Sequence, residues 1–155
     1  MPDLSEALAG IHFVAHLGIE VLEISEGRAQ LALNVQPFMR NSWNVTHGGV
    51  TMTLIDVCMS LSGRSMNPSH LIGVTVELKV SFLSPGIGER LIATARAFPQ
   101  GRSLFCSECE VTAPDGTLIA RGLGTFKLRR IQAGDRAVVP LDKMASPADP
   151  GARPA

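Results

Sequence analysis

The chain has 155 residues, and its 14 Lys and Arg balance 14 Asp and Glu, so the formal net charge is zero. A domain of this length buries roughly 70% of the surface of its unfolded chain without disulfides or a structural metal. Charged residues make up only 18% of the chain, which argues against a nucleic-acid partner. A hydrophobic content of 45% excludes wholesale disorder, and no apolar run approaches the ~18 residues that span a membrane.

The first residues predict a short helix. Asp3-Leu-Ser-Glu6 has the pattern of a capping box, and Gly18 is suited to end the helix. His12 and His16 stand one turn apart on it, but no acidic partner or third ligand accompanies them, so we predict no metal site. No basic region followed by an apolar run opens the chain, so we expect no secretory signal and a cytoplasmic location.

Alternation of apolar and polar residues predicts six strands. The clearest pattern runs from Gly73 to Leu83 and places Val74, Val76, Leu78, Val80 and Phe82 on one face. Short turns that contain Pro and Gly separate the later strands, so consecutive strands should be antiparallel neighbours. The six expected strands are residues 19–25, 27–35, 73–83, 89–98, 103–113 and 117–128.

The segment from Gly48 to Gly63 is apolar nearly all round, which predicts a buried helix. Strands of about ten residues are ~33 Å long, so the sheet must curl around something apolar, and this helix is the candidate. We therefore predict an α+β fold, a curved antiparallel sheet wrapped around a central helix, as one domain over residues 1–130. Residues 131–155 are rich in Pro and Ala and predict a poorly ordered tail.

Asp56 is the only charged residue between Gly48 and Gly63. A lone carboxylate in a buried helix is costly, so it needs partners, a proton or a use. A backbone donor nearby would satisfy it structurally, or the helix would be less buried than its pattern suggests. We favour a functional role, because burial and isolation are typical of catalytic carboxylates.

His47-Gly48-Gly49 stands where the helix begins, and the free backbone N–H groups there stabilise developing negative charge. A tight turn into the helix would explain the same two glycines. Asp56 lies eight residues beyond Gly48, about 12 Å along the axis, so one carbonyl does not readily touch both. Two copies with antiparallel helices would bring Asp56 of one chain to Gly48 of the other, which predicts a site shared across a homodimer.

The run Asn41-Ser-Trp-Asn-Val-Thr-His47-Gly48-Gly49, followed by Leu54-Ile55-Asp56, resembles the signature of hotdog-fold acyl-CoA thioesterases of the phenylacetate-degradation type. The resemblance covers residues 19–128. It implies a hotdog fold and an enzyme that hydrolyses an aromatic or medium-chain acyl-CoA to the free acid and CoA. It implies no cofactor. It also implies homodimers that pair again into tetramers.

The same resemblance implies roles for individual residues. Asp56 would activate water as a general base or attack the carbonyl as a nucleophile, and the sequence leaves both open. Gly48 would donate its N–H to the thioester oxygen, with the Asn41 amide as second donor or polarising group. His47 would orient the loop or the leaving thiol. Thr75 would hold the attacking water, although an ordinary strand threonine fits this position almost as well.

CoA carries phosphates, which need cations near the mouth of the site. Arg102, Arg90 and Arg64 are the candidates, and each also fits an ordinary solvated surface arginine. We favour Arg102, because it stands in the Gly-Arg-Ser turn that belongs to the resemblance.

Three rival functions remain open. An enoyl-CoA hydratase of the same fold would need a His five residues after the Asp, where this chain has Leu61. A non-catalytic acyl-CoA sensor would bind without turnover, and the retained Asp56 argues against it. Cys106 and Cys109 form a Cys-x-x-Cys, but three residues apart on a strand they face opposite sides. We therefore favour buried, inert thiols over a zinc or redox site.

Overall fold

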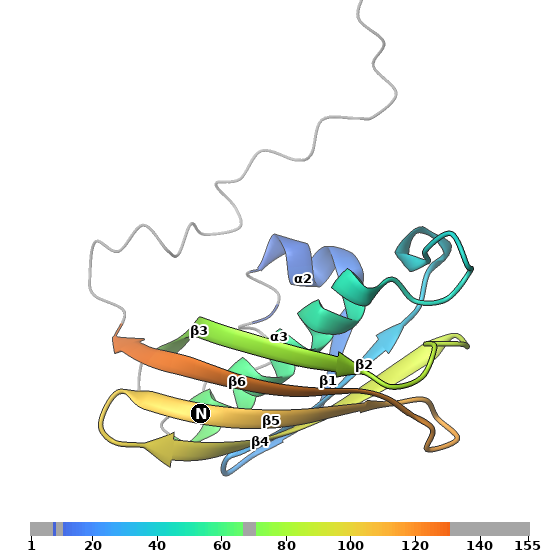
Figure 1. Cartoon of the computed structure of the whole chain (residues 1–155). Coiled ribbons are helices and arrows are strands. Elements are labelled where there is room, and N and C mark those ends of the chain that lie inside the picture. The colour runs from blue at the N-terminus through green and yellow to red at the C-terminus, as the bar shows by residue number, and fades with distance from the viewer. Residues whose placement is uncertain (1–7, 9–10, 67–70, 131–155) are drawn as a thin grey trace, which may run out of the picture.

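The computed structural model describes residues 8, 11–66 and 71–130, so the expected capping box and the tail of residues 131–155 lie outside the described residues. All six predicted strands and the central helix are present (Figure 1). In chain order the elements are α2 (His12–Leu17), β1 (Ile19–Ser25), β2 (Arg28–Asn34), the 3-10 helix η1 (Pro37–Met39), α3 (Gly48–Ser65), β3 (Leu71–Phe82), β4 (Arg90–Gln100), β5 (Leu104–Thr112) and β6 (Leu118–Arg130).

The six strands form one sheet in the order β1-β2-β4-β5-β6-β3, and every neighbouring pair is antiparallel. Helix α3 contacts all six strands and lies across one face of the sheet, and α2 lies on the side of α3 away from the sheet (Figure 1). This confirms the predicted α+β architecture. The expectation that consecutive later strands are neighbours holds for β4, β5 and β6 but was wrong for β3 and β4, since β3 pairs with β6 and β4 pairs with β2 and β5. The connection of residues 83–89 therefore leads from the edge strand past β6 and β5 and does not form a hairpin. Strands β1 and β3 are the two edges of the sheet.

Glycines let α3 approach the sheet closely. A Cβ at Gly63 would overlap the Phe105 ring, and a Cβ at Gly122 would overlap the Ile55 side chain. Phe105 stacks on Phe126 with ring centroids 4.9 Å apart, and both rings are fully buried. At these two glycines no Cβ separates the helix from the sheet, so the two layers pack closely, and a side chain at either glycine would push them apart.

Strand β3 departs from the predicted alternation. A β-bulge between Thr75 and Glu77 interrupts its pairing with β6. Val74 and Val76 are 45% and 62% exposed, whereas Leu78 packs against the core. The expectation that all the valines of this strand share the face of Leu78 was wrong, because one extra residue reverses the phase of a period-two pattern.

Helix α3 is not buried on every face. Leu54, Ile55 and Cys58 are fully buried, but Met52 is 39% exposed and Asp56 is half-buried. The expectation of an all-round buried helix was therefore wrong for one stripe. The sheet covers one side of α3, and within the described residues the six-residue α2 covers only part of the other side.

Candidate active site

The carboxylate of Asp56 has one hydrogen-bond partner among the described residues. The Thr75 hydroxyl donates to Asp56 Oδ1 across 2.8 Å. Asp56 lies in the middle of α3, and Thr75 lies on β3 immediately before the bulge, which leaves its hydroxyl facing the helix. In the described part of the chain no group donates to Oδ2, so this oxygen is open to accept a proton from water.

A cavity of about 610 Å³ opens beside Asp56, a volume typical of small-molecule sites. One stripe of α3, α2 with the segment before it, and the inner side of β3 form its walls. The lining is mostly apolar with a few polar groups: Leu8, Ile11, Phe13, Val14, Gly49, Met52, Thr53, Asp56, Val57, Ser60, Leu61, Arg64, Gly73, Thr75 and Leu78. The predicted carboxylate therefore stands in a pocket that suits an apolar ligand.

His47 caps the start of α3. Its Nδ1 accepts a hydrogen bond from the Gly49 N–H at 3.0 Å, so the proton of the neutral ring lies on Nε2. The His47 N–H donates to the Met39 carbonyl at 2.8 Å, and the buried Thr46 hydroxyl donates to the Gly86 carbonyl at 3.0 Å. These bonds hold the entry to α3 in one conformation.

The N–H of Gly48 has no hydrogen-bond partner among the described residues, as expected for the first residue of a helix. A Cβ at Gly48 would lie 3.3 Å from the Phe82 ring. Gly48 does not line the cavity at Asp56. One chain therefore does not bring the two predicted groups together.

Asn41 organises its own loop. Its Oδ1 accepts from the Trp43 N–H at 2.9 Å and from the Val45 N–H at 3.3 Å. The loop presents the Trp43 side chain to solvent with 84% of it exposed. Asn41, like Gly48, lies outside the cavity beside Asp56 of the same chain.

The three candidate arginines lie in different surroundings. Arg90 forms an ion pair with Glu20 at 2.9 Å and donates to Asn34 Oδ1 at 2.6 Å. Arg102 is exposed in the turn between β4 and β5. Only Arg64, of the three, lines the cavity, and burial lowers the pKa of its guanidinium.

All three cysteines are free thiols. Cys109 faces the core, where the neighbouring Cys58 thiol, by hydrogen bonding, and burial raise the pKa of Cys109. Cys106 faces the other side of the sheet, as predicted, but is half-buried rather than buried. No group of three or more His, Cys, Asp or Glu side chains within the described ranges is arranged to hold a metal.

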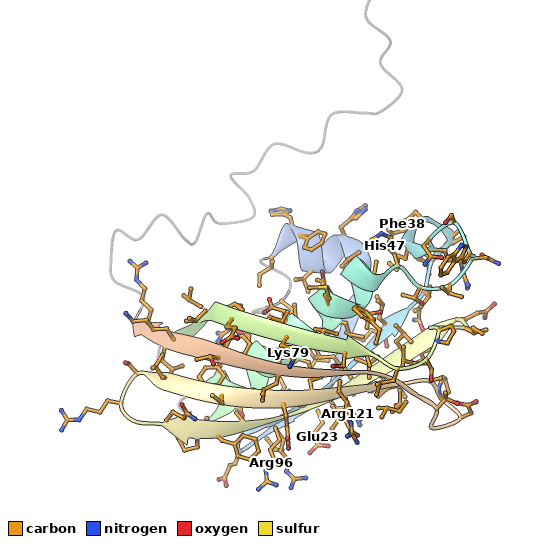
Figure 2. All side chains as sticks on the ribbon, viewed as in Figure 1. Glu23, Phe38, His47, Lys79, Arg96 and Arg121 are labelled. Carbon is orange, nitrogen blue, oxygen red and sulfur yellow. The ribbon has the colours of Figure 1, made fainter. Side chains whose placement is uncertain are left out.

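A second hollow, of about 700 Å³, lies on the sheet face away from α3. Arg28, Lys79, Arg96 and Arg121 line it together with Glu108 and Glu110. Figure 2 shows Arg96 and Arg121 on this face, whereas His47 and Phe38 lie on the helical side. The hollow contains none of the predicted site residues.

Sequence reasoning missed the residues of α2 that line the cavity, and also Ser60 and Gly73. One face of α3 carries residues spaced four apart, namely Met52, Asp56, Ser60 and Arg64. The helical spacing from Asp56 would therefore have predicted that Ser60 and Arg64 lie on the same face. A Cβ at Gly73 would lie 2.8 Å from the Ser60 Oγ, a contact between helix and strand that only the tertiary structure reveals.

The described residues contain no helix with the length and apolar character that crossing a membrane requires.

Known proteins share both the sequence pattern and the fold. The family model of the thioesterase superfamily matches residues 44–120. The medium/long-chain acyl-CoA thioesterase YigI of Salmonella typhimurium is 30% identical over 140 residues, covering 77% of this chain and 90% of the relative.

Two solved structures are similar to this one. A thioesterase family protein from Silicibacter pomeroyi has a TM-score of 0.76 at 26% identity, covering 81% of this chain and 94% of that one. The PaaI protein of the phenylacetic acid degradation operon of Escherichia coli has a TM-score of 0.68 at 24% identity, covering 80% and 89%. The chain therefore belongs to the thioesterase superfamily, and its sheet around a central helix is the hotdog fold that the resemblance implied.

Proposed function

We propose that this thioesterase hydrolyses an acyl-CoA with a medium-chain or aromatic acyl group to the free acid and CoA. The observation that carries the proposal is the Asp56 carboxylate, held by Thr75 at 2.8 Å at the wall of a mainly apolar cavity of about 610 Å³. The name of the Salmonella relative, a medium/long-chain acyl-CoA thioesterase, supports the same chemistry. The fold is also similar to that of the PaaI protein from a phenylacetic acid degradation operon. We therefore keep an aromatic acyl group, as in the phenylacetate-degradation type, within the proposal.

Asp56 acts through Oδ2, because Thr75 occupies Oδ1. As a general base it takes a proton from water while the water oxygen bonds to the thioester carbon, and the C–S bond then breaks. As a nucleophile it forms an acyl anhydride that water hydrolyses. In both routes CoA leaves as the thiolate and is protonated. A single turnover in ¹⁸O-labelled water identifies the second route when water attacks the anhydride at the Asp56 carbonyl, because that attack labels Asp56 and leaves the acid product unlabelled, whereas general-base hydrolysis labels only the acid product.

The oxyanion is stabilised by the Gly48 N–H of a second copy. One chain holds Asp56 and Gly48 apart, and the Gly48 N–H has no partner among the described residues. The edge strand β3 is 12 residues long, and an open edge of this length is a template for pairing with another chain. A homodimer joined at this edge would place the two α3 helices side by side.

The other predicted residues complete the site from the partner subunit's loop. The Asn41 amide is the second donor to the thioester oxygen, and the proton on His47 Nε2 is directed at the leaving sulfur or steadies the loop. Pairing of two dimers into a tetramer remains a prediction from the resemblance.

For the CoA phosphates we retain Arg64 and Arg102 ahead of Arg90. Arg64 lines the cavity eight residues after Asp56, about 12 Å along the helix axis, and Arg102 is exposed on a turn. Arg90 is engaged with Glu20 and Asn34. A cytoplasmic location, where CoA thioesters and free thiols coexist, fits three free cysteines.

Thiol release from a panel of aliphatic and aromatic acyl-CoAs tests the proposal. The wild type should turn over at least one class, and Asp56→Asn should lose about a hundredfold or more in kcat while still binding CoA. Glu108→Gln, a carboxylate on the opposite face of the sheet, is the matched control and should keep full activity. Full activity of Asp56→Asn would contradict the assignment, and a wild type that binds CoA thioesters without turnover would identify a sensor.

A further inference from the structure

We infer that α2 forms the acyl-selecting wall of the cavity and that Phe13 limits the length of the acyl chain that the enzyme accepts. The inference rests on the proposed function, since it assigns the acyl group of the same substrate to one side of the site. It names a specificity-determining residue outside the catalytic machinery.

The stripe of α3 that lines the cavity has two unlike ends. Met52, one turn before Asp56, is apolar, whereas Ser60 and Arg64, one and two turns after it, carry a hydroxyl and a guanidinium. An acyl chain that passed Ser60 and Arg64 would place apolar methylenes against a hydroxyl and a charged guanidinium, whereas Met52 offers them an apolar surface. The acyl chain therefore leaves Asp56 toward Met52, and the polar CoA moiety occupies the end at Arg64.

Helix α2 supplies the wall on the acyl side. Ile11, Phe13 and Val14 line the same cavity as Met52. Phe13 is 60% exposed and Ile11 is 45% exposed, although both are apolar. Large apolar side chains gathered around one cavity mark a surface that a ligand covers, in contrast to apolar residues scattered singly.

Phe13 is presented to the cavity by a firmly held helix. Its neighbours Val14 and Leu17 are buried in the core, with 3% and 6% exposed. The His16 ring contacts the Phe38 ring with centroids 5.5 Å apart, and Gly18 ends the helix in the left-handed conformation at φ 68°. The buried Leu8, 5% exposed, holds the chain before Phe13 as Val14 and Leu17 hold it afterwards. The ring therefore limits the cavity at a set place, and a longer chain cannot easily displace it.

The test compares acyl-length profiles of Phe13 variants. Values of kcat/KM are measured over straight-chain acyl-CoAs of increasing length, and dissociation constants over the matching S-alkyl-CoA thioethers, which cannot be hydrolysed. Phe13→Ala should move the chain-length optimum of kcat/KM and that of thioether binding to longer chains. Affinity should increase about fourfold for each additional methylene that becomes buried. Phe13→Trp should move both optima to shorter chains, and Phe13→Leu should fall between the wild type and Phe13→Ala.

Phe98→Ala is the matched control. Phe98 is an exposed phenylalanine on the face of the sheet away from the cavity, where its ring lies 5.2 Å from the Arg96 guanidinium carbon. Its profile should coincide with that of the wild type, and the unfolding midpoints of all variants should stay close together, since Phe13 is mostly outside the core.

Length profiles that coincide for the wild type and all Phe13 variants, in both assays, would overturn the inference and leave the proposed function intact. A shift in the thioether affinities without thiol release by the wild type would support α2 as the acyl wall and overturn hydrolysis. A wild type that neither binds the thioethers nor releases thiol would overturn both.

Discussion

The Thr75 hydroxyl donates a 2.8 Å hydrogen bond to Asp56 Oδ1, which ties the single carboxylate of α3 to the edge strand β3. The bond leaves Oδ2 as the reactive oxygen and fixes its direction. It exists because the bulge after Thr75 changes which residues of β3 face the helix.

Loss of this bond should slow the reaction. Thr75→Val keeps the size and the branched shape of the side chain, yet it should reduce kcat/KM by about ten- to hundredfold, the usual range for a hydrogen bond to a charged group. Thr75→Ser keeps the hydroxyl and should retain most of the activity. Thr94→Val, on the other face of the sheet, is the control. Equal activity of Thr75→Val and wild type would show that the bond has no role in turnover.

Gly48 offers a direct test of the oxyanion assignment. Gly48→Pro removes the N–H at the first position of α3, where proline is well tolerated, and should lower kcat by about a hundredfold or more with little change in CoA binding. Gly48→Ala keeps the N–H, and its Cβ would meet only the exposed Phe82 ring at 3.3 Å, so it should stay active. An active Gly48→Pro enzyme would place the oxyanion elsewhere.

Mixing two inactive variants tests whether the site is shared. A heterodimer of Asp56→Asn and Gly48→Pro subunits has one site with both residues intact and one site with neither. When equal amounts of the two variants exchange subunits at random, about half of the dimers are heterodimers, and each of these has one working site of two. The mixture should therefore recover about a quarter of the wild-type activity. Each variant incubated alone is the control. If the mixture stays inactive although subunit exchange is demonstrated, Asp56 and Gly48 of one chain serve the same site.

Gly63 should be intolerant of even a methyl group. A Cβ there would overlap the Phe105 ring, so Gly63→Ala should lower the free energy of unfolding by ~1–3 kcal/mol despite the better helix propensity of alanine. Thr53→Ala, on the half-buried side of the same helix, should change stability by only about 0.5 kcal/mol. Denaturant unfolding of both variants measures this, and an unaltered Gly63→Ala would mean that α3 shifts without cost.

The cysteines should differ in reactivity. The Cys58 thiol and burial raise the pKa of Cys109, so Cys109 stays protonated at neutral pH and above, and alkylation needs the thiolate. Native protein treated with an alkylating reagent and mapped by peptide should therefore carry label at the half-buried Cys106 before Cys109 or Cys58. Labelling of all three should require denaturant. Rapid native labelling of Cys109 would contradict the packing of the core.

Local patterns in the sequence determined most of the fold. Period-two alternation identified the strands, the apolar run from Gly48 identified the central helix, and the short turns correctly predicted that β4, β5 and β6 are antiparallel neighbours. They did not predict the partner of β3, which pairs with β6 and not with β4. Asp56 stood out because a charge in such a run is costly, and His47-Gly48-Gly49 stood out because a helix start carries free N–H groups. These signals lie within one turn or a few residues of each other, so they need no knowledge of tertiary contacts.

The tertiary structure alone decided which residues meet. The bulge at Thr75 changed the faces of Val74 and Val76, and periodicity cannot reveal a bulge because it depends on pairing with β6. The same holds for Phe13, which reaches the stripe of Asp56 only because α2 packs over α3. Contacts between residues more than 40 positions apart in the chain are set by how the layers pack, which no local pattern encodes.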